Sequence, residues 1–379
     1  MKAIVIGGGI GGLATAVALR RVGIEVGVFE RTPRIEEVGA GVGLWGNAMR
    51  ALRKLDLYDA VREQGAEIGG EARTWRGRKL FCLSAEELRR RFGESNLAIH
   101  RAKLQTALLS ALPAGTVQLD SALADFAQND SGVTASFADG REVQGDLLVG
   151  ADGLHSATRK RLLGDEPPRY AGLTAWRGVI EDADGLVPEG MGLNLWGRGS
   201  EFGLANIGGN RAYWYATANA PESASVSPTG HKQEVVERFR GWYEPARRAI
   251  EATRETNILR SDIYDREPAK RWGSGRATLL GDAAHPMTPH LGQGACQAIE
   301  DAVALADVLR SPEPTADALR AYERRRSGRT ASIVRRSRRM GRVMQLENPV
   351  LCALRDNLAA AMPTGFQLRL LDPVVGYEA

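Results

Sequence analysis

The chain has 379 residues, which is enough for two or three domains and a large buried core. Its content of 43% hydrophobic and 25% charged residues is typical of a soluble globular protein and excludes a disordered chain. The net charge of +4, from 50 basic and 46 acidic residues, is too small and too mixed to indicate nucleic acid binding.

The cysteines and the apolar segments indicate which cellular environment to expect for the protein. Cys82, Cys296 and Cys352 are far apart and form no CxxC pair or metal-ligand cluster, so we expect no metal site and a reduced, cytoplasmic environment. No stretch approaches about 18 uninterrupted apolar residues, so no membrane span is expected. The N-terminal apolar segment is broken by glycines, so we do not expect it to be a signal peptide.

The first 30 residues predict a strand, a helix and a second strand. The apolar strand at 3–6 is followed at once by GGGIGG, in which Gly7, Gly9 and Gly12 have G-x-G-x-x-G spacing. Such glycines permit a tight turn, close approach to a pyrophosphate and close packing of helix on strand. The second strand ends at Glu30, where an acid reaches a ribose hydroxyl. This unit predicts a site for the AMP half of a dinucleotide without a 2′-phosphate.

The next segments predict further ligand contacts. The glycines of residues 38–47, VGAGVGLWGN, indicate a strand or loop close to a ligand, and Val42 lies in it. An amphipathic helix follows, NAMRALRKLDLYDAV, and then an excursion at 71–95 that reads as a strand and a charged helix. Residues 99–112 predict another amphipathic helix, with Arg101 near its start as either a surface charge or a ligand contact.

A second glycine loop follows the strands TVQLD, GVTASFA and EVQGDLLVG. In GADGLHSATR, residues 150–159, Asp152 and Gly153 lie where a strand gives way to a helix. Ser156 and Arg159 either hold a phosphate or fix the turn. This loop is far in sequence from the first one, yet it is suited to face the same dinucleotide.

From residue 172 to 271 the sequence pattern changes from alternating strands and helices to a series of short strands. Short strand patterns recur, followed by a polar linker at 221–230 and the helical pattern QEVVERFRGWYEPARRAIEA. In one strand Tyr213 and Tyr215 share a face and Trp214 takes the other. These aromatic residues belong either to a core or to a sheet wall above the cofactor.

A third loop, GDAAHPMTPHLGQG at 281–294, follows a buried strand at 277–280 and precedes a long helical pattern. Asp282 offers two acceptors to a ribose or polyol, or serves as a turn residue. Gly292 and Gly294 let the backbone approach a ligand closely, and the helix start presents N–H groups to negative charge.

The C-terminal part is helical. Residues 318–344 predict one long helix with RRSRR at 335–339, whose arginines form a solvated face or, as the alternative, touch a membrane or a partner. The tail at 348–379 predicts one more helix and irregular structure.

Together, GGGIGG with Glu30, GADGLHSATR and GDAAHPMTPHLGQG resemble the group A flavoprotein monooxygenases, the aromatic hydroxylases similar to salicylate, 3-hydroxybenzoate and urate hydroxylases. The resemblance covers residues 1 to about 345. It implies an α/β fold with a Rossmann-like FAD-binding domain, an inserted mixed β-sheet substrate domain and C-terminal helices. We expect the FAD-binding domain to be discontinuous and to comprise residues 1–70, 96–170 and 272–345. The substrate domain is expected at residues 71–95 and 171–271, and the C-terminal helical tail at residues 346–379.

The resemblance also implies FAD as the cofactor and NADH or NADPH as a transient electron donor. The expected cofactor contacts are Gly7, Gly9, Gly12, Glu30, Arg31, Val42, Arg101, Asp152, Asp282, Pro289, Gly292, Gly294 and Ala295. One departure concerns Ala295, Cys296 and Gln297, where many relatives carry Gly or Asn, and it leaves the local flavin contacts open.

The implied reaction is hydroxylation of a small aromatic or heteroaromatic substrate by O₂ through a flavin C4a hydroperoxide. His290 is the expected general base, with a solvent-facing loop histidine as the alternative, and His285 is expected to be structural. Tyr213 and Tyr215 are expected to orient the substrate. Arg198 and Arg211 are either anchors for a substrate carboxylate or surface charges.

Other functions stay open at this stage. An epoxidase or prenyl reductase acting on an apolar alkene would share the three loops, and so would a flavin-binding sensor without turnover. The expected partners are the aromatic substrate and O₂, with no nucleic acid, in a monomer or homodimer.

Overall fold

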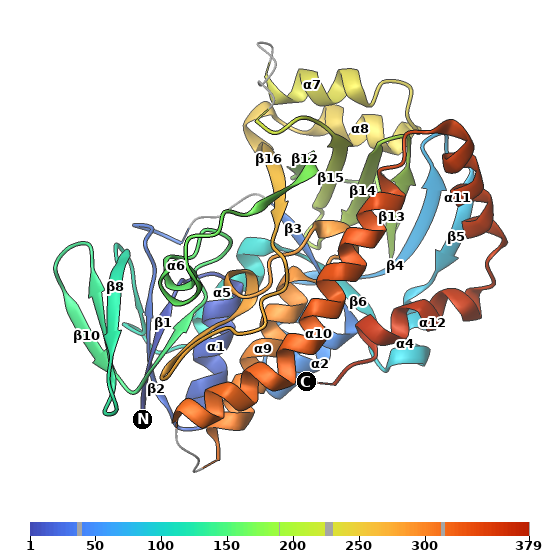
Figure 1. Cartoon of the computed structure of the whole chain (residues 1–379). Coiled ribbons are helices and arrows are strands. Elements are labelled where there is room, and N and C mark those ends of the chain that lie inside the picture. The colour runs from blue at the N-terminus through green and yellow to red at the C-terminus, as the bar shows by residue number, and fades with distance from the viewer. Residues whose placement is uncertain (36–39, 189, 224–229, 312–314, 379) are drawn as a thin grey trace.

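The computed structural model describes residues 1–35, 40–188, 190–223, 230–311 and 315–378. Residues 38 and 39 of the glycine-rich stretch, and 224–229 of the polar linker, lie outside the described residues. The described chain forms a parallel sheet, a large mixed sheet, a small antiparallel sheet and a long C-terminal run of helices (Figure 1).

The parallel sheet has five strands in the order β17-β11-β1-β2-β7. Along β1, Ala3 and Val5 pack against helices, while Ile4 and Ile6 pack against the small antiparallel sheet. Both faces are therefore covered, as is usual for parallel sheets. The strands are β1 (Lys2–Ile6), β2 (Glu25–Phe29), β7 (Val117–Gln118), β11 (Leu147–Gly150) and β17 (Ala277–Leu279).

The small sheet is antiparallel and covers one face of the parallel sheet. Its strands are β8 (Leu123–Gln128), β9 (Val133–Phe137) and β10 (Glu142–Gly145). The segment EVQGDLLVG therefore holds two strands in two different sheets, β10 and β11, rather than the one expected, because the chain passes from one layer to the next at Asp146.

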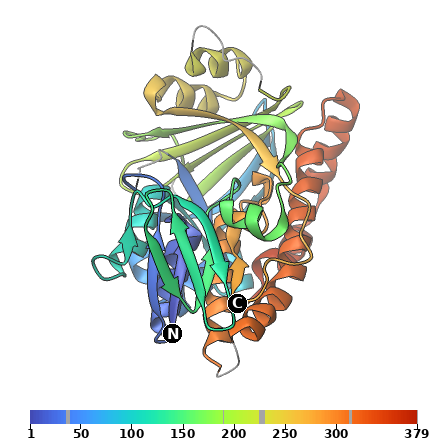
Figure 2. The same ribbon diagram turned by 60° about the vertical axis from the view of Figure 1, so that its left-hand side comes forward.

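The mixed sheet has nine strands, and β4 pairs in parallel with β13 while the other pairs are antiparallel. Figure 2 shows it lying between the parallel sheet and the helices α7 and α8. In the order of the sheet, the strands are β16 (Ile258–Asp265), β12 (Arg169–Ile180), β15 (Ala212–Asn219), β14 (Ser200–Asn206), β13 (Met191–Trp196), β4 (Gly65–Thr74), β6 (Asn96–His100) and β3 (Gly41–Leu44), with β5 (Lys79–Leu83) beside β4.

The helices connect and cover these sheets. The longest, α10, runs along one side of the molecule and leads to α11 and α12 (Figure 2). The helices are α1 (Ile10–Arg21), α2 (Gly46–Lys54), α3 (Tyr58–Arg62), α4 (Ala85–Phe92), α5 (Arg101–Ser110), α6 (Ala157–Leu163), α7 (His231–Arg238), α8 (Glu244–Ala252), α9 (Gly294–Leu309), α10 (Thr315–Met344), α11 (Pro349–Ala361) and α12 (Thr364–Val375), with 3₁₀ turns η1 (Glu255–Asn257), η2 (Gly281–Ala283) and η3 (Pro289–Leu291).

Four expected helices have different bounds. The helix expected at 99–112 begins only at Arg101, because Ile99 and His100 complete the strand β6. The helices expected after residue 46 and after residue 232 are each broken in two, at Asp56 (φ +61°) and Gly241 (φ +79°). The tail holds two helices, not one, separated before Pro363. The fold class expected from the sequence is confirmed, whereas the domain boundaries stay a prediction.

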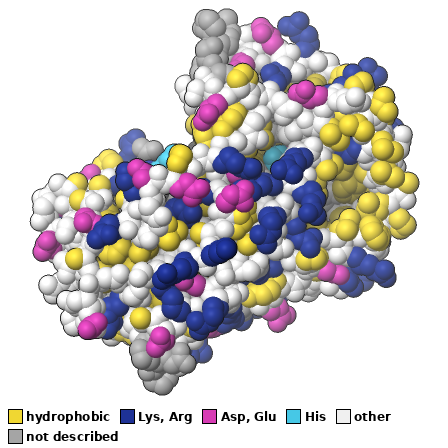
Figure 3. All heavy atoms as spheres, in the orientation of Figure 1, with side chains coloured by type: hydrophobic (Ala, Val, Ile, Leu, Met, Phe, Trp, Pro, Cys, Tyr) yellow, Lys and Arg dark blue, Asp and Glu magenta, His cyan; other side chains and the backbone are white. Residues whose placement is uncertain are grey.

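The outer surface of the C-terminal helices is unusually apolar. Side chains of α11 and α12 are exposed there, beside a row of arginines on α10 (Figure 3): Val350, Leu351, Leu354, Leu358, Phe366 and Leu370 are 46–72% exposed. None of the helices in the described ranges is long and apolar enough to cross a membrane.

Candidate active site

The loop between β1 and α1 is built for close packing and for a ligand. A Cβ on Gly7 (φ +106°) would lie 2.5 Å from the carbonyl oxygen of Ala151, and one on Gly12 would lie 1.9 Å from the Gly7 oxygen. Gly9, the N-cap of α1, has no atom within 4 Å of its missing Cβ, and no side chain caps the helix. Two of the glycines are thus needed for packing, and the third leaves space at an uncapped helix start, where a phosphate binds well.

Glu30 lies directly after β2, and its side chain turns toward this loop. Its Oε2 accepts a hydrogen bond from the Gly8 N–H at 2.6 Å, and its Oε1 accepts from the Thr32 N–H at 3.0 Å. Arg31 beside it is exposed. Oε1 also accepts from Thr32 Oγ1 at 3.1 Å, whereas Oε2 keeps a second lone pair, so Glu30 can fix the glycine loop and still accept a ribose hydroxyl.

The second loop is held by its own side chains. Asp152 accepts from Ser156 Oγ at 2.5 Å and from the Thr158 N–H at 3.0 Å. Ser156 in turn caps α6, because its Oγ accepts from the Arg159 N–H at 2.7 Å. Arg159 is buried and donates to the carbonyl oxygens of Ala283 and Ala284 at 2.9 and 3.1 Å. Of the two roles left open for Ser156 and Arg159, the structure shows that of fixing the turn, and Arg159 also braces the third loop.

The third loop brings Asp282 to the start of α9. A Cβ on Gly294 would be 3.8 Å from Asp282 Oδ1. The side chain is reached by solvent, yet it lies in a concave region where the surrounding protein raises the pKa of Asp282, against the opposing charges of His285 and Arg101. The exposed Arg101, at the start of α5, therefore faces the same region.

The start of α9 is free of side-chain caps. Its N-cap residue Gln293 makes no capping hydrogen bond, and no acid occurs in the first turn. Gly292 has φ +59°, and a Cβ there would lie 2.9 Å from Trp45 Nε1. Pro289 and Gly292 are exposed, Gly294 and Ala295 half-buried. The N–H groups at this helix start are therefore available to a negatively charged ligand.

At residues 295–297, where the sequence differs from many relatives, no reactive side chain points out from the start of α9. Cys296 is fully buried, its Sγ accepts from the Trp45 N–H at 3.5 Å, and burial raises its thiol pKa to about 12. Gln297 is fully buried too, and its amide bonds Gln293 Oε1 at 2.9 Å. Both side chains point into the protein, so only backbone N–H groups are offered outward.

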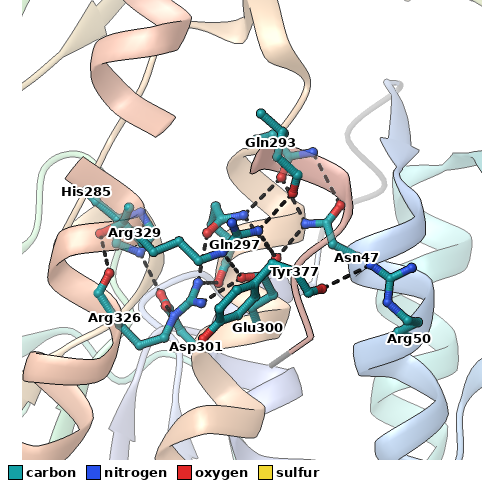
Figure 4. Close-up of polar contacts among 12 residues, drawn as sticks. Asn47, Arg50, His285, Gln293, Gln297, Glu300, Asp301, Arg326, Arg329 and Tyr377 are labelled. Carbon is teal, nitrogen blue, oxygen red and sulfur yellow. Dashed lines mark hydrogen bonds and ion pairs between the residues drawn. The ribbon is translucent and has the colours of Figure 1, made fainter. Parts of the chain in front are cut away.

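Beneath the third loop lies a buried charged cluster, shown in Figure 4. Arg326 of α10 is fully buried and pairs with Glu300 at 2.6 Å and with Asp301 at 2.7 Å. Asp301 also accepts from the Gly281 N–H at 3.1 Å and bonds His285 Nε2 at 2.6 Å. Burial acts to raise the pKa of Asp301, but His285 and Arg326 outweigh it and hold that pKa at about 2. His285 is thus structural, as expected.

The cluster continues to the C-terminus and to α2. Arg329 pairs with Glu300 at 2.7 Å and donates to the backbone oxygens of Pro373 and Val374 at 3.0 and 2.9 Å. On the other side, Asn47 Nδ2 lies 3.0 Å from Gln293 Oε1 (Figure 4). The helix start and the third loop are therefore fixed from behind by buried charges.

The mixed sheet presents one face to these loops. Trp176, Phe202 and Trp214 point to the other face, where they are buried under α7 and α8. Tyr213 and Tyr215 alternate with Trp214 and therefore lie on the face toward the loops, which we call the inner face. The Tyr213 ring packs directly over Gly41 of β3.

Other residues of the inner face were not singled out from the sequence. Glu201 is 4% exposed, and its Oε1 lies 2.7 Å from Asn194 Nδ2 and 3.2 Å from the Tyr215 hydroxyl. Arg177 of β12 lies close enough to Tyr213 to lower its pKa, which burial raises overall. Glu201 and Arg177 could have been found in the sequence, because each is a charged residue in an otherwise apolar strand, EFGLANI for Glu201 and TAWRGVI for Arg177. Arg198 is exposed in the β13–β14 turn, and Arg211 lies in the β14–β15 turn.

His290 lies at the end of the third loop, between the inner face and α10. Its ring packs on Gly341, and neither ring nitrogen has a hydrogen-bond partner among the described residues. Burial lowers the pKa of His290, opposed by the charge of Glu201. The ring borders a cavity of about 350 Å³ that is also lined by Arg169, Arg338 and Arg342.

A second cavity, of about 450 Å³, is lined by Lys2, Asp146 and residues of the small sheet. It lies at the amino ends of β1 and β11, whereas ligands of open α/β sheets bind at the carboxyl ends. The three loops, in contrast, follow the carboxyl ends of β1, β11 and β17, and Val42 of β3 is half-buried.

Comparisons with known proteins give the same picture. The family model of the FAD binding domain matches residues 1–337. The chain is 43% identical to the aurachin C monooxygenase/isomerase of Stigmatella aurantiaca, over 96% of this chain and 94% of that protein. It is 34% identical to the FAD-dependent urate hydroxylase of Klebsiella pneumoniae, over 99% of this chain and all of the other.

Among solved structures, Klebsiella pneumoniae HpxO in complex with FAD and uric acid matches with a TM-score of 0.94 and 32% identity, over 99% of this chain and 96% of that one. These matches confirm the FAD cofactor and the monooxygenase class that the three loops predicted. The chain belongs to the family of class A FAD-dependent monooxygenases that hydroxylate aromatic and heteroaromatic rings.

Proposed function

We propose that this monooxygenase inserts one oxygen atom of O₂ into a small aromatic or heteroaromatic ring held between the third loop and the inner face of the mixed sheet. The observation that carries this proposal is that Arg101 lies close enough to both Tyr213 of the inner face and Asp282 of the third loop to lower the pKa of each, so the face and the loop border one region. An aromatic wall beside a flavin site is suited to a flat ring.

The residues at the loops fit FAD. The space at Gly9 and the free start of α1 suit the pyrophosphate, to which Arg101 adds positive charge. In this proposal Glu30, beside the glycine loop, accepts from the adenosine ribose and Asp282 accepts from the ribityl hydroxyls. The start of α9 would face the pyrimidine edge of the ring, where its N–H groups stabilise negative charge. FAD held by these residues would supply the redox chemistry, with hydride coming from NADH or NADPH and oxygen from O₂.

The protein then orients the ring and handles its proton. His290, with a lowered pKa and two free ring nitrogens, is neutral at pH 7 and is the proposed general base for a ring hydroxyl or N–H. Burial raises the pKa of both Tyr213 and Tyr215, so their hydroxyls stay protonated and act as hydrogen-bond donors. The sheet and α10 keep bulk water from the reacting ring, which limits wasteful oxidation of the donor.

The test is anaerobic stopped-flow absorbance of the purified yellow protein mixed with NADH or NADPH and a panel of phenols, pyridones and quinolones. A ring that strongly accelerates flavin bleaching and then gives a hydroxylated product supports the proposal. Bleaching that no ring accelerates, with product only from an apolar alkene, would favour an epoxidase. A flavin that is never reduced would favour a sensor.

A cofactor variant tests the loop assignment. Asp282→Ala should lower the FAD content of the purified protein, because it removes two acceptors from the site, and the absorbance ratio of flavin to protein measures this. Asp307→Ala, on the outer part of α9, is the matched control and should keep full occupancy. Equal flavin content in the two variants would contradict the role of Asp282.

A further inference from the structure

The inner face of the mixed sheet carries opposite charges at its two ends. Glu201 and Asn194 lie at the β13–β14 end, and Arg177 lies at the β12 end. We propose that this face selects a ring with a hydrogen-bond donor at one edge and an acceptor at the opposite edge, held between Glu201 and Arg177. The inference rests on the proposed function and specifies its substrate class.

At the acidic end, the Glu201 carboxylate has only neutral partners. Its Oε1 accepts from Asn194 Nδ2 at 2.7 Å and from the Tyr215 hydroxyl at 3.2 Å. Within the described ranges of the chain, the hydrogen bonds of this carboxylate go to Oε1, and Glu201 forms no ion pair. A buried carboxylate in such surroundings is stabilised by one more donor. A ring N–H or O–H placed at Oε2 would supply it.

At the basic end, Arg177 keeps its charge available to the inner face. Its Nη1 donates to Ser261 Oγ at 2.8 Å, a neutral partner, and the structure shows no ion pair of Arg177 within those ranges. The charge of Arg177 acts on Tyr213, and so does that of Arg101. A carbonyl or phenolate oxygen at this edge of the ring would accept from Arg177, and its negative charge would be stabilised.

The register of the sheet sets both ends on one line. In the cross-strand register, Arg177 of β12 lies opposite Tyr215 of β15, and Tyr215 lies opposite Gly203 of β14. Gly203 in turn lies opposite Asn194 of β13, so the four residues lie on one face of four adjacent strands. The line spans three strand spacings, roughly 14 Å. A Cβ on Gly203 would be 2.1 Å from the Tyr215 ring, so this glycine lets the ring lie flat across β14 between the charged ends.

This arrangement disfavours a ring that places a carboxylate at the β13–β14 end. A ring carboxylate at the β13–β14 end would lie against Glu201, and two like charges at low dielectric repel strongly. The class that fits is a neutral ring with N–H or O–H opposite C=O, such as a pyridone, a quinolone or an acylated phenol. The charge of Glu201 acts on His290, and Arg169, Arg338 and Arg342 line the cavity beside the His290 ring. The charges of Arg177 and Arg101 act on Tyr213.

The experiment uses isosteric ligands and the oxidised holoenzyme. Binding of 4-quinolone, whose N–H lies opposite its carbonyl, is compared with chromone, which has a ring oxygen in place of N–H, by titrating the flavin absorbance change. We expect 4-quinolone to bind about 10- to 100-fold more tightly, the range for a hydrogen bond to a charged group. The O–H arm compares 4-hydroxyacetophenone with its methyl ether in the same way.

Three variants test which residues cause the preference for 4-quinolone over chromone. Glu201→Gln should reduce the quinolone-to-chromone ratio to below about 3, whereas Arg177→Met should weaken both ligands alike because both keep the carbonyl. Tyr215→Phe removes a competing donor and should keep the ratio at or above its wild-type value. Glu142→Gln, an exposed glutamate of β10, is the matched control and should bind as the wild type does.

The outcomes separate this inference from the proposed function. An unchanged ratio in Glu201→Gln, or a ratio near one in the wild type or in Tyr215→Phe, overturns the inference even when the rings still accelerate flavin reduction. Preferential binding of benzoates without a donor overturns it too. If no ring perturbs the flavin or accelerates its reduction, the proposed function itself fails.

Discussion

A glycine lies against each of the two tyrosines of the inner face. The missing Cβ of Gly41 would be 2.4 Å from the Tyr213 ring, and that of Gly203 would be 2.1 Å from the Tyr215 ring. Both rings therefore lie over backbone, and their position depends on the absence of a single methyl group. Since Tyr215 also bonds Asn194 and Glu201, a shift of its ring would disturb the acidic end of the face.

Gly203→Ala should raise the KM for the aromatic substrate and leave FAD content unchanged. The added methyl would force the Tyr215 ring away at a cost of about 1–3 kcal/mol. Steady-state kinetics and the flavin-to-protein absorbance ratio measure the two effects. Gly70→Ala in β4 is the control, because its added Cβ meets nothing within 4 Å. A KM equal to that of the control would show that the Tyr215 ring does not contact the substrate.

His290 gives a prediction about pH. Burial lowers its pKa below 6.5, so the neutral form that accepts a proton persists to a lower pH than for a solvent histidine. The wild-type kcat should therefore stay level from pH 8 to about 6.5 and fall only below that value.

In His290→Asn this acid limb should disappear and kcat should drop, by about 100-fold if the residue is the base. The protein should remain yellow, since no cofactor group depends on this ring. His155→Asn, at an exposed position, serves as the control. A variant that hydroxylates at the wild-type rate would show that another group takes the proton.

At the scale of elements, α9 connects the flavin loop to the buried charges. Its first residues offer free N–H groups, while Glu300 and Asp301, two turns later, bind Arg326 of α10 and the backbone of Gly281. The loop is therefore held in place by α9 and α10 as well as by Arg159 and its own backbone hydrogen bonds. Such positioning suits a site that must not reorganise when negative charge develops on the cofactor.

Arg326→Met should destabilise the protein by about 3–5 kcal/mol, because it leaves two carboxylates buried with fewer partners. FAD affinity should fall as well, since Asp301 fixes the backbone at Gly281. Urea unfolding with and without FAD measures both effects. Arg325→Met removes a solvent-exposed pair with Asp307 and should change stability far less. Equal unfolding midpoints would show that the cluster does not hold the loop.

Sequence patterns predicted the structure best where residues close together in the chain determine it. The loops at Gly7, Asp152 and Asp282 could be placed because glycine spacing and strand ends are visible along the chain. The role of Arg159 as a brace could not be foreseen, because its acceptors lie 124 and 125 residues away. Glu201 was missed for a similar reason: its partners come from two other strands, and only the register brings them together.

At the scale of the whole molecule, the C-terminal residues close over the charged cluster. Arg50 donates to the backbone oxygens of Val375 and, at 3.0 Å, Tyr377, and the Arg329 guanidinium lies 4.0 Å from the Tyr377 ring. Leu368, Val374 and Val375 also cover Phe92 and Leu88 of α4. The tail is therefore part of the structure that supports α2 and α9.

Removal of residues 364–379 should lower the melting temperature by several degrees and increase loss of FAD on dilution, because Arg50 and Arg329 lose buried acceptors. Differential scanning fluorimetry and flavin fluorescence measure these effects. Removal of residues 378–379 alone, which spares Tyr377 and all of these acceptors, is the control. A full-stability protein without α12 would show that the tail only covers the surface.

The three loops of the flavin site also set an order of events during synthesis. The first loop leaves the ribosome some 270 residues before the strand β17 and the start of α9, which complete the parallel sheet and the site. At about 5–20 residues per second, this separation lasts roughly 15–60 s. In the second half of that interval, after β11 has been made, the edge of β11 that pairs with β17 stays unpaired and the third loop is still absent. Flavin capture therefore comes late, as a step that marks a nearly finished chain rather than one that starts its folding.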